Sequence, residues 1–215
     1  MQELSSKLKA LKDEFLMLGE KIEEYLRKIL LAQVEGGAPN ESLVGADAQF
    51  EELIIRIENK CFEIIAVGHL PPVHLRLMGN LIKMLADLEQ IVFNAAKIAR
   101  IVPNSDRTHL DGRGNVRDMS ERALRMFRNT LRAFSQEDRE LALGVIDEDN
   151  QVINAHARCF CELLDSAKGH PAPKDQAAIT QLMSITKSID RIAHHAANIG
   201  KRVLAVITDG KEERS

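Results

Sequence analysis

The sequence predicts an all-α protein made of two tandem, antiparallel three-helix bundles related by an internal repeat. Three observations lead to this prediction: the composition, a segment that recurs at a fixed offset, and apolar side chains spaced as on one helix face. Of the 215 residues, 45% are hydrophobic but only 4% are aromatic. Leu, Ile, Val, Ala and Met must therefore build the core, which suits helix-on-helix packing better than a β-sandwich.

The charge of the chain is nearly balanced, with 29 basic and 32 acidic residues and a formal net charge of −3. This balance gives no general attraction to nucleic acid or anionic lipid, so we expect no nucleic-acid partner and membrane contact only through partner proteins. The chain shows no secretory signal and no apolar stretch near the ~18 residues that span a bilayer, so we expect a soluble, cytoplasmic protein.

A short segment recurs at an offset of 101 residues. Gly68-His69-Leu70-Pro71-Pro72 resembles Gly169-His170-Pro171-Ala172-Pro173, and the same offset pairs Leu88-Glu89-Gln90-Ile91 with Ile189-Asp190-Arg191-Ile192. Several matches in one register indicate a duplication. We therefore expect residues 1–102 and 117–215 to be equivalent repeats, each with its own core, and residues 103–116 to be the linker between them.

The first repeat contains three helical segments. An opening helix covers about residues 4–34, and the glycines and proline of residues 36–40 separate it from a second helix, which Asn40 could cap. The second helix carries an apolar stripe within residues 50–64, and residues 68–72 end it. The seam of the third helix alternates steps of four and three, as in helix bundles. Its members are Leu77, Leu81, Met84, Leu88, Ile91, Ala95, Ile98 and Val102.

The second repeat follows the same order. Its opening helix covers about residues 117–133, and Ser135 followed by Asp138 has the spacing of an acidic capping box at the start of the next helix. Residues 168–174 form the last turn. The seam of the sixth helix consists of Ala178, Leu182, Ile185, Ile189, Ile192, Ala196, Ile199 and Val203. Leu88 and Ile189 are the predicted equivalent core positions.

Three stretches of the first repeat form a recognisable series: Cys61–Val67, Pro72–Arg76 and Asp87–Ile91. They resemble the PhoU family, whose members are two tandem three-helix bundles. They are similar to the family's apolar helix end, its Pro-Val turn with an Asp-Leu-Arg start, and its Asp-Leu-Glu-Arg-Ile-Gly-Asp helix. Asp190-Arg191-Ile192 repeats the last element in the second half, so the resemblance covers nearly the whole chain.

The resemblance implies a role. PhoU-like proteins are cytoplasmic adaptors that dock to the ATPase of a phosphate ABC transporter and to a sensor histidine kinase. They restrain phosphate uptake and the phosphate-starvation response, and a homodimer is the expected form. Two alternatives stay open. One is the soluble regulatory domain of a sodium–phosphate cotransporter. Met1 and a first helix of the type found in standalone family members argue against it. The other is a metal-binding helical bundle.

The resemblance also implies metal binding, because family members hold metal clusters through Glu/Asp-x-x-x-Asp pairs. Residues four apart share a helix face, so two oxygen ligands can reach one cation. In the first half Asp47 and Glu51 keep such a pair, but Glu89 is followed four residues later by Phe93, which cannot ligate a metal. Here solvated carboxylates are the favoured interpretation.

In the second half Asp149 has Ile153 four residues later, whereas Asp190 has His194. An Asp–His pair suits zinc, iron or another transition metal better than calcium or magnesium. For this half a metal site and a solvated surface are equally weighted, and a metal is expected at Asp190 and His194 with Asp149 nearby.

We expect no enzymatic activity. A carboxylate-bridged di-iron bundle needs Glu-x-x-His elements, and no His of this chain has a Glu three residues before it. Long helical faces favour a docking protein instead. The residues expected on the outward, partner-binding face of the third helix carry little net charge: Lys83, Asp87, Gln90, Asn94 and Lys97.

Overall fold

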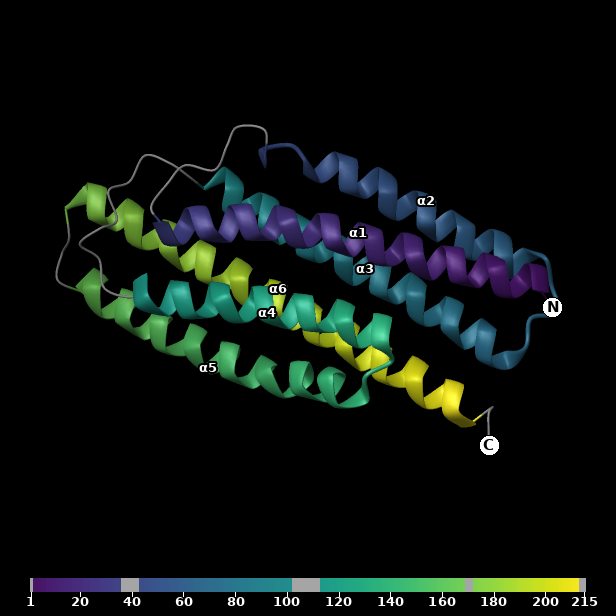
Figure 1. Cartoon of the computed structure of the whole chain (residues 1–215). Helices are drawn as coiled ribbons and strands as arrows, with labels where there is room; N and C mark the ends of the chain where they lie inside the picture. Colours follow the sequence, from purple (N-terminus) through teal and green to yellow (C-terminus); the bar gives the residue numbers. More distant parts are fainter. Residues whose placement is uncertain (1, 36–42, 102–112, 169–171, 213–215) are drawn as a thin grey trace.

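The computed structural model describes residues 2–35, 43–101, 113–168 and 172–212 (Figure 1). These ranges contain six α-helices and no strand, so the all-α prediction is confirmed. The helices are α1 Gln2–Glu35, α2 Asp47–Ala66, α3 Pro72–Arg100, α4 Arg113–Gln136, α5 Arg139–Lys168 and α6 Pro173–Glu212. No helix in the described residues is both long enough and apolar enough to cross a bilayer.

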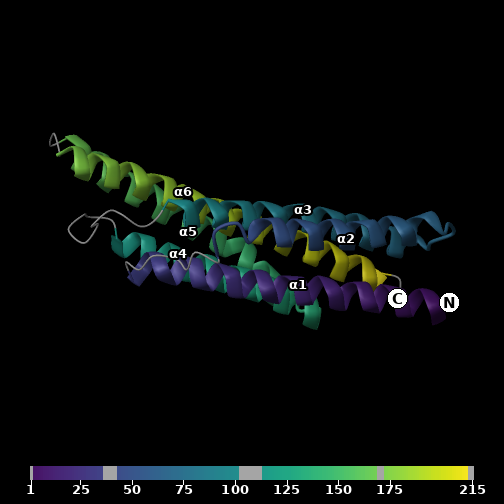
Figure 2. The same cartoon turned by 90° about the horizontal axis from the view of Figure 1, so that it is seen from above.

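The helices α1, α2 and α3 form one bundle, and α4, α5 and α6 form the other. The two bundles lie side by side, with α3 along α6 and α1 along α4 (Figures 1 and 2). The Arg76–Asp209 ion pair and the Asp87–His195 contact join α3 to α6. Arg76 precedes Asp87 along α3, whereas their partners occur in the opposite order along α6, where Asp209 follows His195. The two helices are therefore antiparallel.

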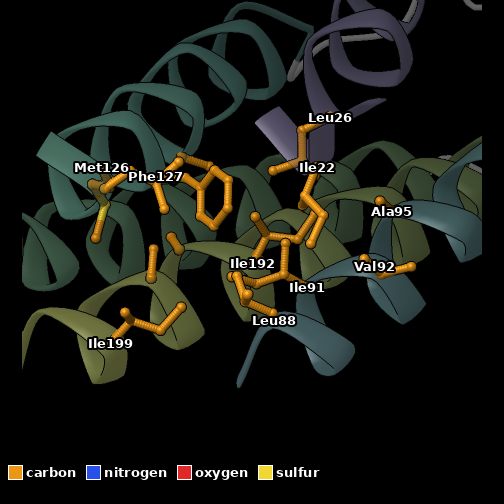
Figure 3. Close-up of a cluster of buried hydrophobic side chains, with 14 of the residues drawn as sticks. Ile22, Leu26, Leu88, Ile91, Val92, Ala95, Met126, Phe127, Ile192 and Ile199 are labelled. Carbon is orange, nitrogen blue, oxygen red and sulfur yellow. The ribbon is translucent and has the colours of Figure 1, made fainter. Parts of the chain in front are cut away.

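Separate cores for the two halves were expected, and this expectation is wrong. The buried side chains of both bundles belong to one continuous cluster, in which Ile22 and Leu26 of α1, Ile91 of α3, Phe127 of α4 and Ile192 of α6 lie together (Figure 3). The reason is that α3 and α6 are apolar on more than their seams, so each helix buries a second face against the other.

The predicted seams are otherwise correct. Leu88 and Ile189 are each 0% exposed, as their equivalence in the repeat requires. In α3 the first member, Leu77, is only half-buried, and Val102 lies outside the described residues. Every seam residue of α6 from Ala178 to Val203 is buried.

The α2–α3 turn shows why its sequence recurs as a helix boundary. Gly68 and His69 both have a left-handed backbone, with φ of 75° and 56°, which stops α2. Pro71 is then the N-cap of α3 and Pro72 its first residue, a position where the missing proline N–H costs no hydrogen bond. His69 is therefore a turn residue, as expected, while His170 lies outside the described residues.

Three helix starts differ from the sequence-based expectation. First, α4 begins at Arg113, so residues 113–116 are helical although we placed them in the linker. Second, Asp138 itself caps α5, because its Oδ1 accepts a hydrogen bond from the Leu141 N–H at 3.0 Å, whereas Ser135 lies inside α4. Third, α2 begins at Asp47 with Ala46 as its N-cap, and the predicted cap Asn40 lies outside the described residues.

Candidate functional site

Two predicted site residues of the second half meet between α5 and α6. His194 Nδ1 lies 3.3 Å from Asp149 Oδ2, although the residues are 45 positions apart in sequence. The Asp149 side chain is only 13% exposed, and its Oδ1 atom is buried with no hydrogen-bond partner within the described residues. Asp190 lies one helical turn before His194 and is half-buried, so it shares that face of α6.

This arrangement fits a metal in part. A buried carboxylate oxygen without a partner is costly, and a cation would satisfy it. One carboxylate and one imidazole are suitable ligands for zinc or another transition metal. However, no group of three or more His, Cys, Asp or Glu side chains in the described part of the chain could hold a metal ion as placed. Asp149 and His194 thus offer two ligands, with Asp190 close by on the same helix.

The first half does not fit the expected metal site. Asp47 forms an ion pair with Arg100, whose Nη2 lies 2.5 Å from Asp47 Oδ2. This ion pair connects the start of α2 to the end of α3. Burial, helped by the negative charge of Asp47, raises the pKa of the neighbouring Tyr25 to about 12. The Tyr25 hydroxyl donates a hydrogen bond to the Leu43 carbonyl at 3.3 Å. Asp47 is therefore part of the local packing of α1, α2 and α3.

Glu51 and Glu89 do come together, but without Asp47. They line one hollow between α2 and α3, where Glu58 joins them. Phe93, which replaces the fourth carboxylate of the family pattern, is 50% exposed, and Lys97 Nζ lies 5.7 Å from the centre of its ring. Sequence reasoning missed Glu58, although its spacing of seven residues from Glu51 was a signal that both share one face of α2.

The predicted partner-binding face of α3 is only partly outward. Lys83, Gln90 and Lys97 are exposed, as expected. Asn94 is buried at 6% exposure and donates a hydrogen bond to the Gln90 carbonyl at 2.8 Å. Asp87 faces α6, where its Oδ1 lies 2.9 Å from His195 Nδ1. These two residues are corrections to the prediction, which treated this side of α3 as free when α6 in fact covers it.

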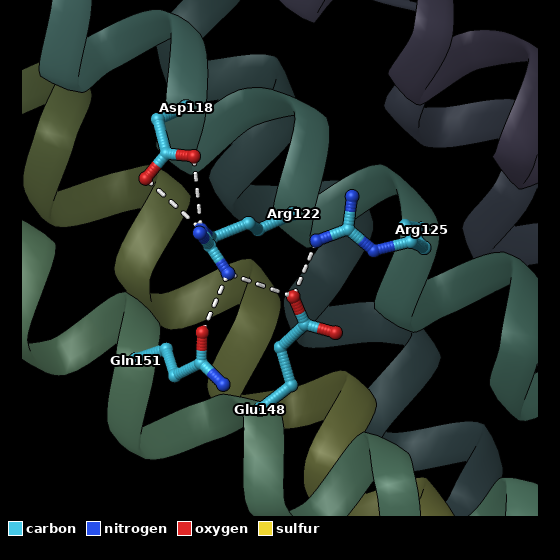
Figure 4. A network of polar contacts seen from close by, with 5 residues as sticks. All are labelled: Asp118, Arg122, Arg125, Glu148 and Gln151. Atoms are coloured by element: carbon cyan, nitrogen blue, oxygen red, sulfur yellow. Dashed lines mark hydrogen bonds and ion pairs between the residues drawn. The ribbon is translucent and has the colours of Figure 1, made fainter.

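A polar network on α4 and α5 was not predicted (Figure 4). Arg122 Nε contacts both carboxylate oxygens of Asp118 at 2.9 Å, and its Nη1 lies 3.1 Å from Glu148 and 2.8 Å from Gln151. Arg125 also binds Glu148. The hydrogen bond to Asp118, helped by the charge of Glu148, raises the pKa of Arg122. The network fixes α4 against α5, and only its four-residue Asp118–Arg122 spacing was visible in sequence.

Comparison with known proteins finds PhoU proteins, in both sequence and fold. The family model described as the PhoU domain matches residues 116–203, which cover most of the second bundle. The Pseudomonas putida "Phosphate-specific transport system accessory protein PhoU homolog" is 26% identical over 212 residues, which is 96% of this chain and 81% of the relative. The Clostridium acetobutylicum protein of the same name is 26% identical over 212 residues, 96% of this chain and 94% of the relative.

The chain is similar to PhoU proteins over nearly its whole length, and residues 116–203 match the PhoU domain. The fold agrees across both bundles. The crystal structure of PhoU from Pseudomonas aeruginosa superposes with a TM-score of 0.86 at 23% identity, covering 95% of this chain and 98% of the other. The phosphate transport system regulatory protein PhoU from Streptococcus pneumoniae gives a TM-score of 0.83 at 22% identity, covering 94% and 96%. The first bundle, which the family model leaves unmatched, is thus also part of a PhoU-like fold.

Proposed function

We propose that this protein is a cytoplasmic regulator of phosphate transport that restrains phosphate uptake and the phosphate-starvation response. It does so by docking to the ATPase of a phosphate ABC transporter and to a sensor histidine kinase. The observation that supports this proposal is the match to accessory proteins of phosphate-specific transport over 96% of the chain. A match of that length involves both bundles and the junction between them.

The polar groups of the structure support docking as the mode of action. The pairs Asp87–His195 and Asp149–His194 are contacts between helices, so these polar side chains take part in the packing of the fold. Two surface hollows, of about 180 and 130 Å³, are each smaller than the 300–1,000 Å³ usual for small-molecule sites. A helical surface with shallow hollows suits recognition of another protein, for which a few anchoring side chains supply most of the binding energy.

A gene deletion tests the proposal. In phosphate-rich medium, the deletion strain should take up radiolabelled phosphate faster than the parent and should express its phosphate-starvation genes. Supplying the gene in trans should restore both to the parental level. The purified protein should also co-elute with the purified transporter ATPase and with the kinase. Unchanged uptake and gene expression in the deletion strain would contradict the proposal.

We propose a homodimer as the working form. Sedimentation equilibrium should then give twice the chain mass of 24.0 kDa at micromolar concentration. A mass of one chain at every concentration would overturn the dimer.

A metal-loaded form is the second candidate. The observation that favours it is the buried, unpartnered Asp149 Oδ1 beside His194. Asp149 and His194 would hold zinc, iron or another divalent metal, with Asp190 as the adjacent carboxylate. A bound ion would cross-link α5 to α6 and stabilise that half of the protein.

A further inference from the structure

The hollow between α2 and α3 combines an apolar floor with an acidic rim. It has a volume of about 130 Å³, and its lining includes Glu51, Ile55 and Glu58 from α2 and Leu85, Ala86 and Glu89 from α3. Leu85 is buried in the core below, while Ile55 is 55% exposed. An aliphatic side chain as exposed as Ile55, next to a hollow with an apolar floor, is a surface that gains from being covered.

The rim of the hollow consists of three glutamates. Within the described residues, Glu51, Glu58 and Glu89 form no ion pair. Other glutamates of the same bundle do: Glu14 pairs with Lys60, and Glu23 pairs with Arg128 of α4. Three uncompensated negative charges around one hollow produce a local negative potential that attracts a cationic partner and repels anionic lipid and nucleic acid.

The spacing of the lining residues matches a helix. Glu51, Ile55 and Glu58 follow one another at steps of four and three on α2, so acid, apolar and acid positions succeed one another at intervals of about 5 Å along the groove. A helix packed against α2 and α3 would place its own side chains at the same intervals along its axis. The packing would be that of a fourth helix added to the α1–α2–α3 bundle.

We propose that this groove binds a basic amphipathic helix of a partner protein. An aliphatic side chain of that helix covers Ile55 and Ala86, and Lys or Arg side chains one turn to either side contact Glu51, Glu58 and Glu89. The inference rests on the proposed adaptor function and adds to it the docking surface and the chemistry of the partner. Phe93, one helical turn after Glu89 on α3 and 50% exposed, is a further apolar side chain on that helix.

Fluorescence anisotropy with a designed peptide tests the proposal on the full-length protein. The labelled probe is a helical Ala/Gln peptide that carries Lys, Leu and Lys on one face at spacings of four and three. A second peptide has the same composition, with Lys and Leu on opposite faces. We expect saturable binding of the first peptide, about tenfold weaker binding of the second, and a loss of affinity when salt is raised.

Protein variants locate the binding. The triple variant Glu51→Gln/Glu58→Gln/Glu89→Gln should bind the first peptide about tenfold more weakly, since three charge contacts are lost. Ile55→Gln should also weaken binding. The matched control is Asp13→Asn/Glu52→Gln/Glu63→Gln, which removes three exposed charges outside the hollow and should change affinity by less than about twofold. Circular dichroism should show equal helix content in all variants.

Several outcomes overturn the proposal. They are no saturable binding, equal affinity for the two peptides, or equal affinity of the two triple variants. Self-association of the unmodified protein that is lost in the Glu51/Glu58/Glu89 variant would identify a second copy as the occupant, which also overturns it. The deletion experiment is independent: increased phosphate uptake without peptide binding leaves the proposed function intact, whereas peptide binding without any uptake phenotype rejects that function alone.

Discussion

Asp87 of α3 and His195 of α6 meet across the junction of the two bundles, with 2.9 Å between Asp87 Oδ1 and His195 Nδ1. Their side chains are 13% and 18% exposed. The preceding residue, His194, contacts Asp149 of α5 instead, and the two imidazole rings lie edge to face with centres 5.8 Å apart. Two consecutive residues of α6 therefore connect it to both bundles.

The Asp87–His195 contact should contribute measurably to stability because both side chains are largely shielded from water. In a double-mutant cycle with Asp87→Ala and His195→Ala, urea unfolding should give a coupling energy of about 0.5–3 kcal/mol. The control cycle uses Arg117→Ala and Glu121→Ala, whose side chains are 67% and 56% exposed and should couple by no more than about 0.5 kcal/mol. Equal coupling in both cycles would show that the junction pair is unimportant.

The seam positions of α3 and α6 should be equally sensitive to truncation. Leu88→Ala and Ile189→Ala should each lower the free energy of unfolding by about 2–5 kcal/mol, through lost burial and the cavity left behind. Met17→Ala, at a position 54% exposed, should change it by less than about 0.5 kcal/mol. Unchanged melting curves for both seam variants would contradict the assigned core.

Gly19 and Gly79 should respond differently to the same substitution. A Cβ at Gly79 in α3 would meet nothing within 4 Å, so Gly79→Ala should stabilise the protein by about 0.5–1 kcal/mol through helix propensity. A Cβ at Gly19 would lie 2.5 Å from Leu131 Cδ2, where α1 touches α4. Overpacking costs about 1–3 kcal/mol, so Gly19→Ala should lose the stabilisation or reverse it. Thermal melts of the two variants compare them directly, and equal shifts would contradict close α1–α4 packing.

The three cysteines should differ in reactivity. Cys161 is exposed. Burial, helped by the negative charge of Glu58, raises the pKa of Cys61 to about 11. Burial, helped by the charge of Glu162, raises the pKa of Cys159 to about 11. At pH 8 a thiol reagent should modify one equivalent quickly, and Cys161→Ser should abolish that fast phase. In denaturant all three thiols should react, and fast modification of two or more thiols in the native protein would contradict the burial.

The raised thiol pKa values also set a pH dependence. Above about pH 9 an unfolded chain releases the thiol protons that the folded protein keeps up to about pH 11. Folding stability should therefore fall as pH rises through that window.

Any metal that the protein binds should depend on residues of the second bundle. Elemental analysis of protein purified without chelators should find metal that is lost in His194→Ala and in Asp149→Asn but kept in Asp47→Ala. His156→Ala, two helical turns after Asp149 on α5, is the control histidine and should keep the metal. Stoichiometric metal that survives His194→Ala and disappears in Asp47→Ala would place the site in the first bundle.

Much of the fold could be predicted because apolar spacing along a helix reports which face is buried. The α6 seam from Ala178 to Val203 is buried throughout. The α3–α6 contact could not be predicted, since a seam shows that a helix has a partner but does not say how many. The buried Asn94, which looked like an outward polar residue, follows from that second contact.

The contacts of the candidate site could likewise be predicted only in part. The approach of Asp149 to His194 follows from the repeat and the antiparallel order of α5 and α6. Antiparallel order also brings the start of α2 near the end of α3, but nothing in the sequence indicated that Asp47 would be paired with Arg100. Sequence spacing predicts contacts within a helix but not those between helix ends.

The antiparallel packing of α3 on α6 has an evolutionary consequence. The two helices are equivalent elements of the repeat, so each uses the same surface to contact the other, as two subunits do in an isologous dimer. A single repeat unit with this face would be complementary to a second copy of itself. Once duplication placed both copies in one chain, their association no longer depended on protein concentration. Each copy could then change independently: at one shared repeat position the first half now carries Phe93 and the second half carries His194.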